Sequence, residues 1–360
     1  MTRLSELRSS LLNHSLFPPT TLARAIDRLG FIQADPIRCP ARSQDLILRH
    51  RVKNYKAGDL EKRYPTLNLE EDYTFAYGFL PNHHRDLLHP RSDYKPTAIE
   101  RKVIEVVNRI GPAHPSKVHE YCGSKSVRNA WGGQSKLAKQ ALEEAHHHGL
   151  LRVAHRENGI RIYEKTNLQP QHRSPSRRFE ELLKLTVNLF GPTSERFLMT
   201  EARQYGYLVP NRIERRRLLY RLVDESILSK NTVDGIDYLC PKRTRNRTKQ
   251  PDSVKLLAPF DPVVRDRDRF EHLWGWTYRF EAYTPAAKRV RGYYALPLLW
   301  REDIIGWANA KVTESHLNVE IGFERKPTNQ SAFKNALEAE VRSFAVFLDL
   351  VPDAWTIRFS

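Results

Sequence analysis

Two polar residues that could do chemistry together stand near the start of the chain, in the stretch GFIQADPIRCPARSQDL. They are Gln33 and Asp35, two positions apart. In an extended segment their side chains point to the same face, because alternate residues of a strand share a face. Pro36 favours this geometry, since the residue before a proline is pushed toward extended dihedral angles. The segment therefore presents an amide and a carboxylate about 7 Å apart at their Cα atoms.

Such a pair could hydrolyse the bond between a cationic base and its sugar. A purine alkylated at N7 or N3 carries a positive charge and leaves readily, so the transition state needs a negative charge near the oxocarbenium-like sugar and a positioned water. A carboxylate supplies the charge and accepts the proton of the water, while an amide can hold that water. In the alternative interpretation Asp35 is a turn residue and Gln33 a surface residue, and spacing alone leaves both open.

The charge of the chain indicates its partner. Lys and Arg number 59 against 42 Asp and Glu, which gives a net charge of +17. Such an excess attracts polyanions by releasing their counterions, so nucleic acid is the expected partner. A basic protein without this role is the alternative. A membrane surface is disfavoured, because no basic amphipathic helix stands out.

Other chemistries find no support in the sequence. The chain lacks the phosphate-loop pattern GxxxxGK[ST], the dinucleotide fingerprint GxGxxG and the GxSxG elbow, so we predict no cofactor. It has two histidine runs: His83, His84 and His89, and His146, His147 and His148. Neither has the spacing of a zinc site. We predict no metal and expect these histidines at helix ends that face phosphate or solvent.

Cysteine usage and hydropathy indicate a compartment. Cys39, Cys122 and Cys240 are isolated and form no CxxC pair, which predicts neither a disulfide framework nor a thiolate zinc site. No apolar run approaches the roughly 18 residues that span a bilayer. The start, MTRLSELRSS, lacks the apolar core of a signal peptide. We expect a soluble protein of the cytoplasm.

An internal repeat indicates the architecture. Two stretches have a β-prone run, a polar turn that ends in glycine and a second β-prone run: residues 150–163 and 227–239. Their turns, Asn158-Gly159 and Asp234-Gly235, favour hairpins because these residue types tolerate positive φ. Helical periodicity precedes each hairpin, at 97–110 and 134–148 and again at 177–190 and 211–225. Helices followed by a hairpin indicate the winged helix-turn-helix arrangement, in which three helices precede the hairpin.

The ends of the chain complete the predicted fold. The first hundred residues suggest a third, divergent copy with helices near 4–14, 20–29, 42–51 and 57–63, although no short glycine turn marks a wing. The segment 241–251 is a basic linker, either a phosphate-contacting strap or a solvated charge run. After it come strand-like runs at 255–264, 276–285, 291–300, 303–312 and 316–323, a helix at 331–350 and a strand at 355–359. These strands predict a small barrel.

We therefore predict an α+β fold with three tandem winged helix-turn-helix domains packed around a C-terminal β-barrel. The predicted domains are residues 1–95, which hold the Gln33 and Asp35 pair, 96–168, 169–250 with the basic linker, and 251–360 with the barrel and its helix.

Several stretches together resemble the AlkZ/YcaQ-type winged-helix DNA glycosylases. The run Gln33-Ala34-Asp35-Pro36-Ile37, with Arg42, Leu46, Leu48 and Arg51 after it, resembles the Gln-x-Gln/Asp motif region of that family. The stretches LAPFDPVVRDRDRFEHLWGW and YTPAAKRVRGYYALPLL resemble its C-terminal signatures. The resemblance covers essentially the whole chain.

The resemblance implies a DNA glycosylase of base excision repair that acts on alkylated bases and on interstrand crosslinks. It implies Asp35 as the carboxylate that stabilises the cationic sugar or activates water, and Gln33 as the residue that positions the water. Aspartate at the second position places the chain with the YcaQ-like branch, which favours a broad range of monoadducts. Residues 71–81 lack a histidine expected in many relatives, a departure that concerns crosslink unhooking. The motif includes no lysine, so we expect a monofunctional enzyme.

Several basic residues are candidate DNA contacts: Arg38, Arg42, Arg51, Arg215, Arg216, Lys288 and Arg289. Arg215 and Arg216 fall at the start of the third helix of the later repeat, an element that commonly faces the major groove. The expected partner is double-stranded DNA with alkylated bases or crosslinks, bound by a monomer associated with the nucleoid. A non-catalytic winged-helix regulator is the alternative function. A regulator normally dimerises, and no heptad zipper stands out here.

Overall fold

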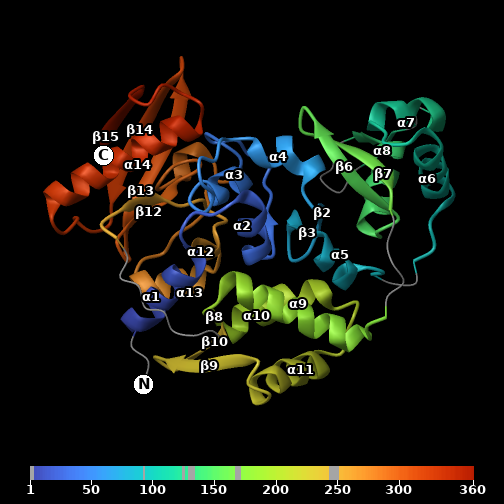
Figure 1. Cartoon of the computed structure of the whole chain (residues 1–360), viewed down its shortest axis with the longest axis horizontal. Coiled ribbons are helices and arrows are strands. Elements are labelled where there is room, and N and C mark those ends of the chain that lie inside the picture. The colour runs from blue at the N-terminus through green and yellow to red at the C-terminus, as the bar shows by residue number, and fades with distance from the viewer. Residues whose placement is uncertain (1–3, 92–93, 124–125, 129–133, 167–171, 243–250) are drawn as a thin grey trace. The chain divides into compact units, whose positions relative to one another are not determined.

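The computed structural model describes residues 4–91, 94–123, 126–128, 134–166, 172–242 and 251–360 (Figure 1). Most of the basic linker, residues 243–250, lies outside the described residues. The chain divides into two compact units. The first combines Met1–Leu60, Leu183–Glu201 and Leu219–Ser360, and the second combines Glu61–Leu182 and Ala202–Leu218. Each unit is therefore assembled from segments that are far apart in the sequence.

The first unit begins with three helices and a very short strand: α1 (Leu4–Ser15), α2 (Leu22–Leu29), β1 (Ile32–Gln33) and α3 (Ser43–Leu48). The Thr21 hydroxyl accepts a hydrogen bond from the Arg24 backbone N–H at the start of α2. Gly30 ends this helix in the left-handed conformation, with φ of 75°. The Gln33 and Asp35 segment therefore leaves the helix at a defined point. α4 (Asp59–Arg63) follows at the boundary of the two units.

The later repeat forms the elements that its sequence predicts. In chain order they are α9 (Pro175–Phe190), β8 (Thr193–Ser194), α10 (Glu195–Glu201), η2 (Ala202–Tyr205), α11 (Arg212–Asp224), β9 (Leu228–Val233) and β10 (Ile236–Pro241). β10 pairs antiparallel with both β9 and β8. Asp234 and Gly235 form the turn with φ of 49° and 76°. The predicted hairpin and the helices before it are confirmed.

The earlier repeat lies in the second unit and likewise has helices followed by a hairpin, with a short strand pair, β4 and β5, between its second and third helices. Its elements are α6 (Ala98–Ile110), α7 (Pro115–Cys122), β4 (Ser126–Arg128), β5 (Gln134–Lys136), α8 (Leu137–His147), β6 (Leu151–Glu157) and β7 (Ile160–Lys165). A capping box of Thr97 and Glu100 starts α6. Asn158 and Gly159 form the β6–β7 turn with φ of 50° and 83°. This hairpin is also confirmed.

A third hairpin, which the sequence did not indicate, lies in the second unit. η1 (Tyr64–Thr66) precedes it, β2 (Leu69–Tyr73) and β3 (Tyr77–Pro81) form it, and α5 (Asn82–Leu88) follows. Its turn has no glycine, and the Thr74 backbone N–H donates to the Ala76 carbonyl at 2.9 Å. Nearly all of β2 and β3 is buried on both faces, so the period-two signal of a half-exposed strand is missing.

The last part of the first unit is an open sheet, and the predicted closed barrel is wrong. Its strands are β11 (Val254–Leu256), β12 (Leu296–Trp300), β13 (Asp303–Thr313), β14 (His316–Phe323) and β15 (Trp355–Phe359), paired in that order. Among the described residues no pairing joins β11 to β15. α14 (Gln330–Phe347) connects β14 to the parallel β15 and packs against both edge strands, as Figure 1 shows. A helix, not further pairing, therefore covers the sheet.

The strand predicted at 276–285 is also wrong. This segment is irregular and follows two short helices, α12 (Pro262–Arg265) and α13 (Arg267–Trp274), and a 3-10 turn, η3 (Ala286–Lys288), comes after it. Its aromatic side chains reach the strands in place of its backbone. The Trp276 indole N–H donates to the Ile304 carbonyl at 3.1 Å, and the Tyr278 hydroxyl donates to the Ala295 carbonyl at 2.6 Å.

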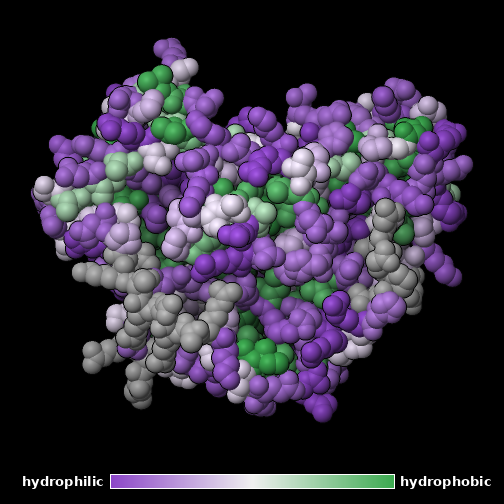
Figure 2. Space-filling model, in the orientation of Figure 1, coloured by the Kyte–Doolittle hydropathy of each residue, from purple (hydrophilic) through white to green (hydrophobic). Residues whose placement is uncertain are grey.

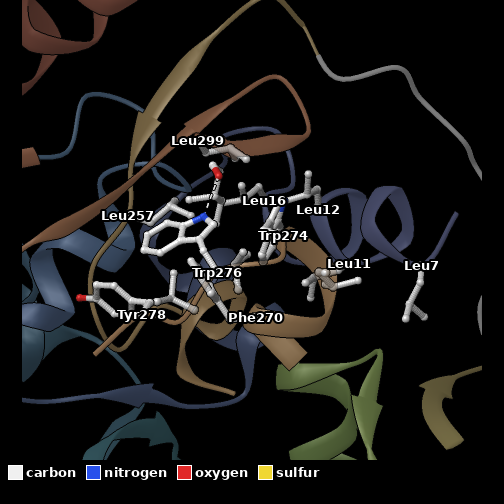
Figure 3. Packing of buried hydrophobic residues seen from close by; sticks show 14 of the residues in the cluster. Leu7, Leu11, Leu12, Leu16, Leu257, Phe270, Trp274, Trp276, Tyr278 and Leu299 are labelled. Atoms are coloured by element: carbon white, nitrogen blue, oxygen red, sulfur yellow. Dashed lines mark hydrogen bonds between the residues drawn. The ribbon is translucent and has the colours of Figure 1, made fainter. Parts of the chain in front are cut away.

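The main core of the first unit joins the N-terminal helix α1 to residues between Val233 and Ile304 (Figure 3). α1 contributes Leu7, Leu11 and Leu12, which lie against aromatic residues of α13 and the segment after it. The ring centroids of Phe270 and Trp276 are 5.0 Å apart. The N-terminal helix thus packs on the same cluster as the start of the open sheet.

The surface agrees with the polar composition. Figure 2 shows one face on which hydrophilic residues predominate and hydrophobic residues gather in small patches. None of the helices in the described part of the chain combines the length and the apolar character needed to cross a membrane.

Candidate active site

Gln33 and Asp35 lie in a short segment that is anchored on both sides. Phe31 and Ile32 are buried, while Gln33 and Asp35 are half-buried. Ile32 and Gln33 form the strand β1 in this segment. Asp35 lies just after β1 in a turn, where its Oδ1 atom accepts a hydrogen bond from the Ile37 backbone N–H at 2.9 Å. This bond fixes the orientation of the Asp35 carboxylate, two residues after Gln33.

α3 contacts this segment through a hydrogen bond that Gln44 accepts. The Gln44 side chain is buried, and its Oε1 atom accepts a hydrogen bond from the Asp35 backbone N–H at 3.4 Å. Burial raises the pKa of Asp35, and the bond from Ile37 lowers it by a smaller amount. The charged form of this carboxylate is therefore less favourable than in water, which increases its basicity toward a proton donor.

Arg265, 232 positions later in the chain, holds the side chain of Gln33. Nη1 of Arg265, the last residue of α12, donates to Gln33 Oε1. Nη2 of the same guanidinium donates to Oε2 of Glu201, at the end of α10, at 3.0 Å. Glu201 balances the charge of Arg265, so the amide is held by a guanidinium that is itself fixed.

This contact determines which way the amide points. A guanidinium has only donors, so the group that faces Arg265 must be the amide oxygen of Gln33. The NH2 group of Gln33 then points away from Arg265. On its remaining side Gln33 therefore offers donors and not an acceptor.

A buried ion pair supports α12. The Asp261 carboxylate accepts from the Val263 backbone N–H at 3.0 Å and so caps the start of α12. Arg51 binds the same carboxylate with two hydrogen bonds, Nη1 to Oδ2 at 2.8 Å and Nη2 to Oδ1 at 3.0 Å. Arg51 therefore supports Arg265 through α12.

Arg51 was a candidate DNA contact, and that prediction is wrong. Its exposed fraction is 0%. Its guanidinium is bound by Asp261 and by the Ser15 and Ile47 carbonyls. A buried arginine with these partners cannot reach a phosphate, and its role is structural.

The pKa of the Tyr294 hydroxyl responds to the charge of Asp35. Tyr294 is buried, and burial raises its pKa, with a further rise caused by the negative charge of Asp35 and a smaller opposite effect of the Ser43 hydroxyl. The phenol therefore keeps its proton. Its ring packs edge-on against Phe280, with centroids 5.4 Å apart.

The remaining candidate DNA contacts differ in exposure. Arg38, Arg216 and Lys288 are exposed, whereas Arg42, Arg215 and Arg289 are half-buried. Arg42 stands directly before α3, and its carbonyl accepts from the backbone N–H groups of Asp45 and Leu46. All six remain candidates for phosphate contacts.

Two of the histidines do not lie where the sequence suggested. His89 and His146 are buried, so the expectation of helix ends that face phosphate or solvent is wrong for both. His89 Nε2 lies 2.6 Å from Asp72 Oδ2, and His146 Nε2 lies 2.8 Å from the Glu71 carbonyl. In the described part of the chain no group of three or more His, Cys, Asp or Glu side chains is arranged to hold a metal ion.

The cysteines do not add a nucleophile. Burial raises the pKa of the Cys39 thiol, which lies in the same segment as Asp35. Burial also raises the pKa of Cys122, and that of Cys240 to about 11. Thiols with raised pKa values are mostly protonated and weakly nucleophilic near neutral pH.

Sequence reasoning did not assign Arg265, Gln44 and Tyr294 to the site. Arg265 and Tyr294 lie within the C-terminal stretches that resemble the family signatures, but nothing in their spacing links them to Gln33. Arg265 and Gln33 are 232 positions apart. Gln44 is closer, nine positions after Asp35, and its place on the buried face of α3 was the available signal.

Comparisons with known proteins define the class as DNA glycosylase. A family model described as DNA glycosylase AlkZ-like matches residues 26–347. The chain belongs to this family of DNA repair enzymes, so the enzyme is selected over the regulator. Among solved structures, Streptomyces sahachiroi DNA glycosylase AlkZ is similar with a TM-score of 0.64 and 13% identity, over 98% of each chain. This likeness shows a shared mixed α+β fold.

Proposed function

We propose that the chain is a monofunctional DNA glycosylase that hydrolyses the N-glycosidic bond of purines alkylated at N7 or N3. The observation that carries this proposal is the contact of Arg265 with the Gln33 amide oxygen, two residues from a half-buried carboxylate. It leaves a hydrogen-bond donor and a proton acceptor in one segment of a DNA glycosylase. These are the two functions that attack by water requires.

The proposed reaction uses one water molecule. The water accepts a hydrogen bond from Gln33 Nε2 and donates one to the Asp35 carboxylate. As the water oxygen attacks C1′, its proton passes to Asp35 and the bond from C1′ to the base nitrogen breaks. The base leaves with the bonding electrons, which neutralise its positive charge, so no general acid is needed. The negative charge of Asp35 also stabilises the oxocarbenium-like sugar.

The proposed substrates are alkylated monoadducts and interstrand crosslinks. The Gln-x-Asp pattern at Gln33 and Asp35 supports assignment to the YcaQ-like branch and a broad range of alkylated monoadducts. Unhooking of interstrand crosslinks, which join two such alkylated purines, follows from the same chemistry. The similar solved protein is named as a DNA glycosylase.

We further propose that three winged-helix domains, 1–95, 96–168 and 169–250, carry the chain on double-stranded DNA as a monomer. The confirmed hairpins β6–β7 and β9–β10 support this, and the hairpin β2–β3 is the candidate wing of the proposed first domain. The candidate phosphate contacts are Arg38, Arg42, Arg215, Arg216, Lys288 and Arg289. The proposed place of action is the nucleoid in the cytoplasm.

Base release from defined DNA tests the function. A duplex with one N7-methylguanine and a duplex with a nitrogen-mustard crosslink are incubated with excess wild type, Asp35→Asn or Gln33→Ala. We expect release by wild type, with a loss of about 10² to 10⁴ in rate for Asp35→Asn and a smaller loss for Gln33→Ala. Strand breaks should appear only after alkali, because a monofunctional enzyme leaves an intact abasic site.

The control variant is Lys334→Ala, which changes an exposed residue of α14. It should release base at the wild-type rate. Absence of release by wild type, or an undiminished rate for Asp35→Asn, contradicts the proposal. Release from the monoadduct without unhooking of the crosslink limits the substrate range to monoadducts.

A further inference from the structure

One loop of the first unit holds several large apolar side chains in solvent. Tyr283 is 81% exposed, Val290 is 76% exposed and Tyr293 is 41% exposed. Single exposed apolar residues are ordinary, but a group of them in one loop marks an interaction surface. We call residues 283–293 the aromatic loop.

The aromatic loop is held in shape by Glu281, two residues before it in the chain. The Glu281 carboxylate accepts hydrogen bonds from three backbone N–H groups: those of Val290 at 2.9 Å, Arg291 at 2.8 Å and Gly292 at 3.2 Å. Across the loop, Arg289 Nε donates to the Thr284 carbonyl at 2.8 Å. These contacts join both ends of the loop, so its exposed side chains are presented by a fixed backbone.

The base of the loop is also tied to the sheet. Asn309 on β13 donates from Nδ2 to the Arg291 carbonyl at 2.7 Å. Gly292 has φ of 118°, and a Cβ atom there would lie 2.5 Å from Asn309 Oδ1. The close approach of the loop to β13 therefore requires glycine at this position.

The charges of the loop fit an anionic partner. Lys288 is exposed at the end of η3, and the Arg289 guanidinium lies 5.0 Å from the Tyr293 ring centroid. The Arg291 guanidinium is paired with Glu324, with a shortest distance of 2.5 Å. Lys288 and Arg289 are thus the cations that accompany the exposed rings, a combination that suits phosphates beside bases.

The aromatic loop lies next to the candidate active site. The Tyr283 and Phe280 ring centroids are 6.1 Å apart, and Phe280 and Tyr294 are 5.4 Å apart. The segment of Asp35 approaches the strand that holds this loop, since Cys39 Sγ lies 4.0 Å from the carbonyl of Ala310, the neighbour of Asn309 on β13. A row of aromatic rings therefore runs from the exposed Tyr283 to Tyr294 in the part of the unit that the Asp35 segment contacts.

We propose that the aromatic loop is a wedge that enters double-stranded DNA at the base step beside the damaged nucleotide. Tyr283 and Val290 fill the gap between base pairs, and Lys288 and Arg289 hold the neighbouring phosphates. Opening a step breaks the stacking between neighbouring bases, and an exposed ring on a fixed backbone replaces that stacking. This inference rests on the proposed function, since it takes damaged DNA as the partner.

Two substrates with the same N7-methylguanine test the wedge, one fully paired and one in a small mismatched bubble. The bubble is already open, so only the paired substrate needs the wedge. We expect Tyr283→Ala to lose about tenfold to hundredfold in single-turnover rate on paired DNA, and less than about threefold on the bubble. Tyr283→Phe keeps the ring and should retain the wild-type rate on both.

The matched control is Phe359→Ala, which removes a 61% exposed ring of β15 in the same unit. It should leave both rates unchanged. Equal losses for Tyr283→Ala on the two substrates, or no loss on paired DNA, overturn the proposal.

A binding measurement separates the wedge from catalysis. In the Asp35→Asn background, a 2-aminopurine next to the lesion should brighten on binding because its stacking is broken. The added Tyr283→Ala change should abolish this rise without abolishing binding. If wild type releases no base, the proposed function fails while this measurement still tests the wedge, and a rise that survives Tyr283→Ala rejects it.

Discussion

Gln33 contributes to the site through the end of its amide that Arg265 leaves open. Because Arg265 occupies the oxygen, the amide donors remain for the water in the proposed reaction, and Asp35 is the proposed acceptor. The proposal therefore gives the two residues different functions.

Gln33→Glu tests this polarity with almost no change in size. A glutamate at this position would accept from Arg265 but offer no donor to the water, so base release should fall by about as much as in Gln33→Ala, tenfold to hundredfold. Thermal unfolding should not occur at a lower temperature, because an ion pair with Arg265 replaces the neutral contact. A Gln33→Glu enzyme with the wild-type rate would show that the amide donors are not used.

The raised pKa of Asp35 predicts a pH dependence. The carboxylate must be ionised to accept the proton of the water, so kcat/KM should rise with pH through the pKa of Asp35 and then level off. Burial raises this pKa, and the rise should occur at higher pH than for an exposed aspartate. A rate that stays constant across this range would exclude Asp35 as the base.

The same shift has a consequence for stability. A carboxyl group whose pKa is raised in the folded state binds its proton more tightly when folded, so ionisation at neutral pH destabilises the fold. Asp35→Asn should therefore unfold at a temperature equal to or above that of wild type while losing activity. Calorimetry at neutral pH measures this difference.

At the scale of elements, local signals predicted what depends on local geometry. The turns at Asn158-Gly159 and Asp234-Gly235 were correct, because left-handed residues at a turn are visible in the sequence. The hairpin of β2 and β3 has no such residue and is buried on both faces, so neither turn chemistry nor alternation revealed it. Closure of the C-terminal sheet depends on where α14 packs, which alternation within a strand cannot indicate.

Only the residues of the candidate site that are close together in the sequence could be predicted. Gln33 and Asp35 follow from spacing and from the family resemblance. Arg265 reaches Gln33 across 232 positions, and no pattern in one sequence reports such a contact. Arg51 was misassigned for the same reason, because its partner Asp261 is 210 positions away.

The Arg51 and Asp261 pair predicts a stability change that is separate from DNA binding. Arg51→Met leaves a buried carboxylate without its cation, which should cost about 3 to 5 kcal/mol in the free energy of unfolding. The double variant with Asp261→Asn should lose less, because asparagine still caps α12 and carries no charge. Urea titration of wild type and the two variants gives the comparison. Unchanged stability with weaker DNA binding would return Arg51 to the DNA contacts.

At the scale of the whole molecule, the net charge of +17 predicts a salt dependence. The logarithm of the affinity for undamaged duplex should fall linearly with the logarithm of the salt concentration, by about 0.9 for each phosphate contact. Arg38→Ala and Lys288→Ala should each reduce the slope by about one. Lys334→Ala should not change it. Fluorescence anisotropy over a range of salt measures the slopes, and unchanged slopes in both variants would remove these residues from the contact surface.

The residues around Asp35 also set the moment at which activity can arise during synthesis. Gln33 is made early, its anchors Glu201 and Arg265 much later, and Tyr294 later still. A ribosome that has translated only the first 260 residues holds the catalytic pair without the guanidinium that orients it. If the proposed reaction holds, unfinished chains and proteolytic fragments that end before α12 lack the group that orients Gln33 and should not release bases. The chain can be expressed as two separate pieces that are divided just before α12. Base release should return only when the two pieces reassemble, so activity reports their association.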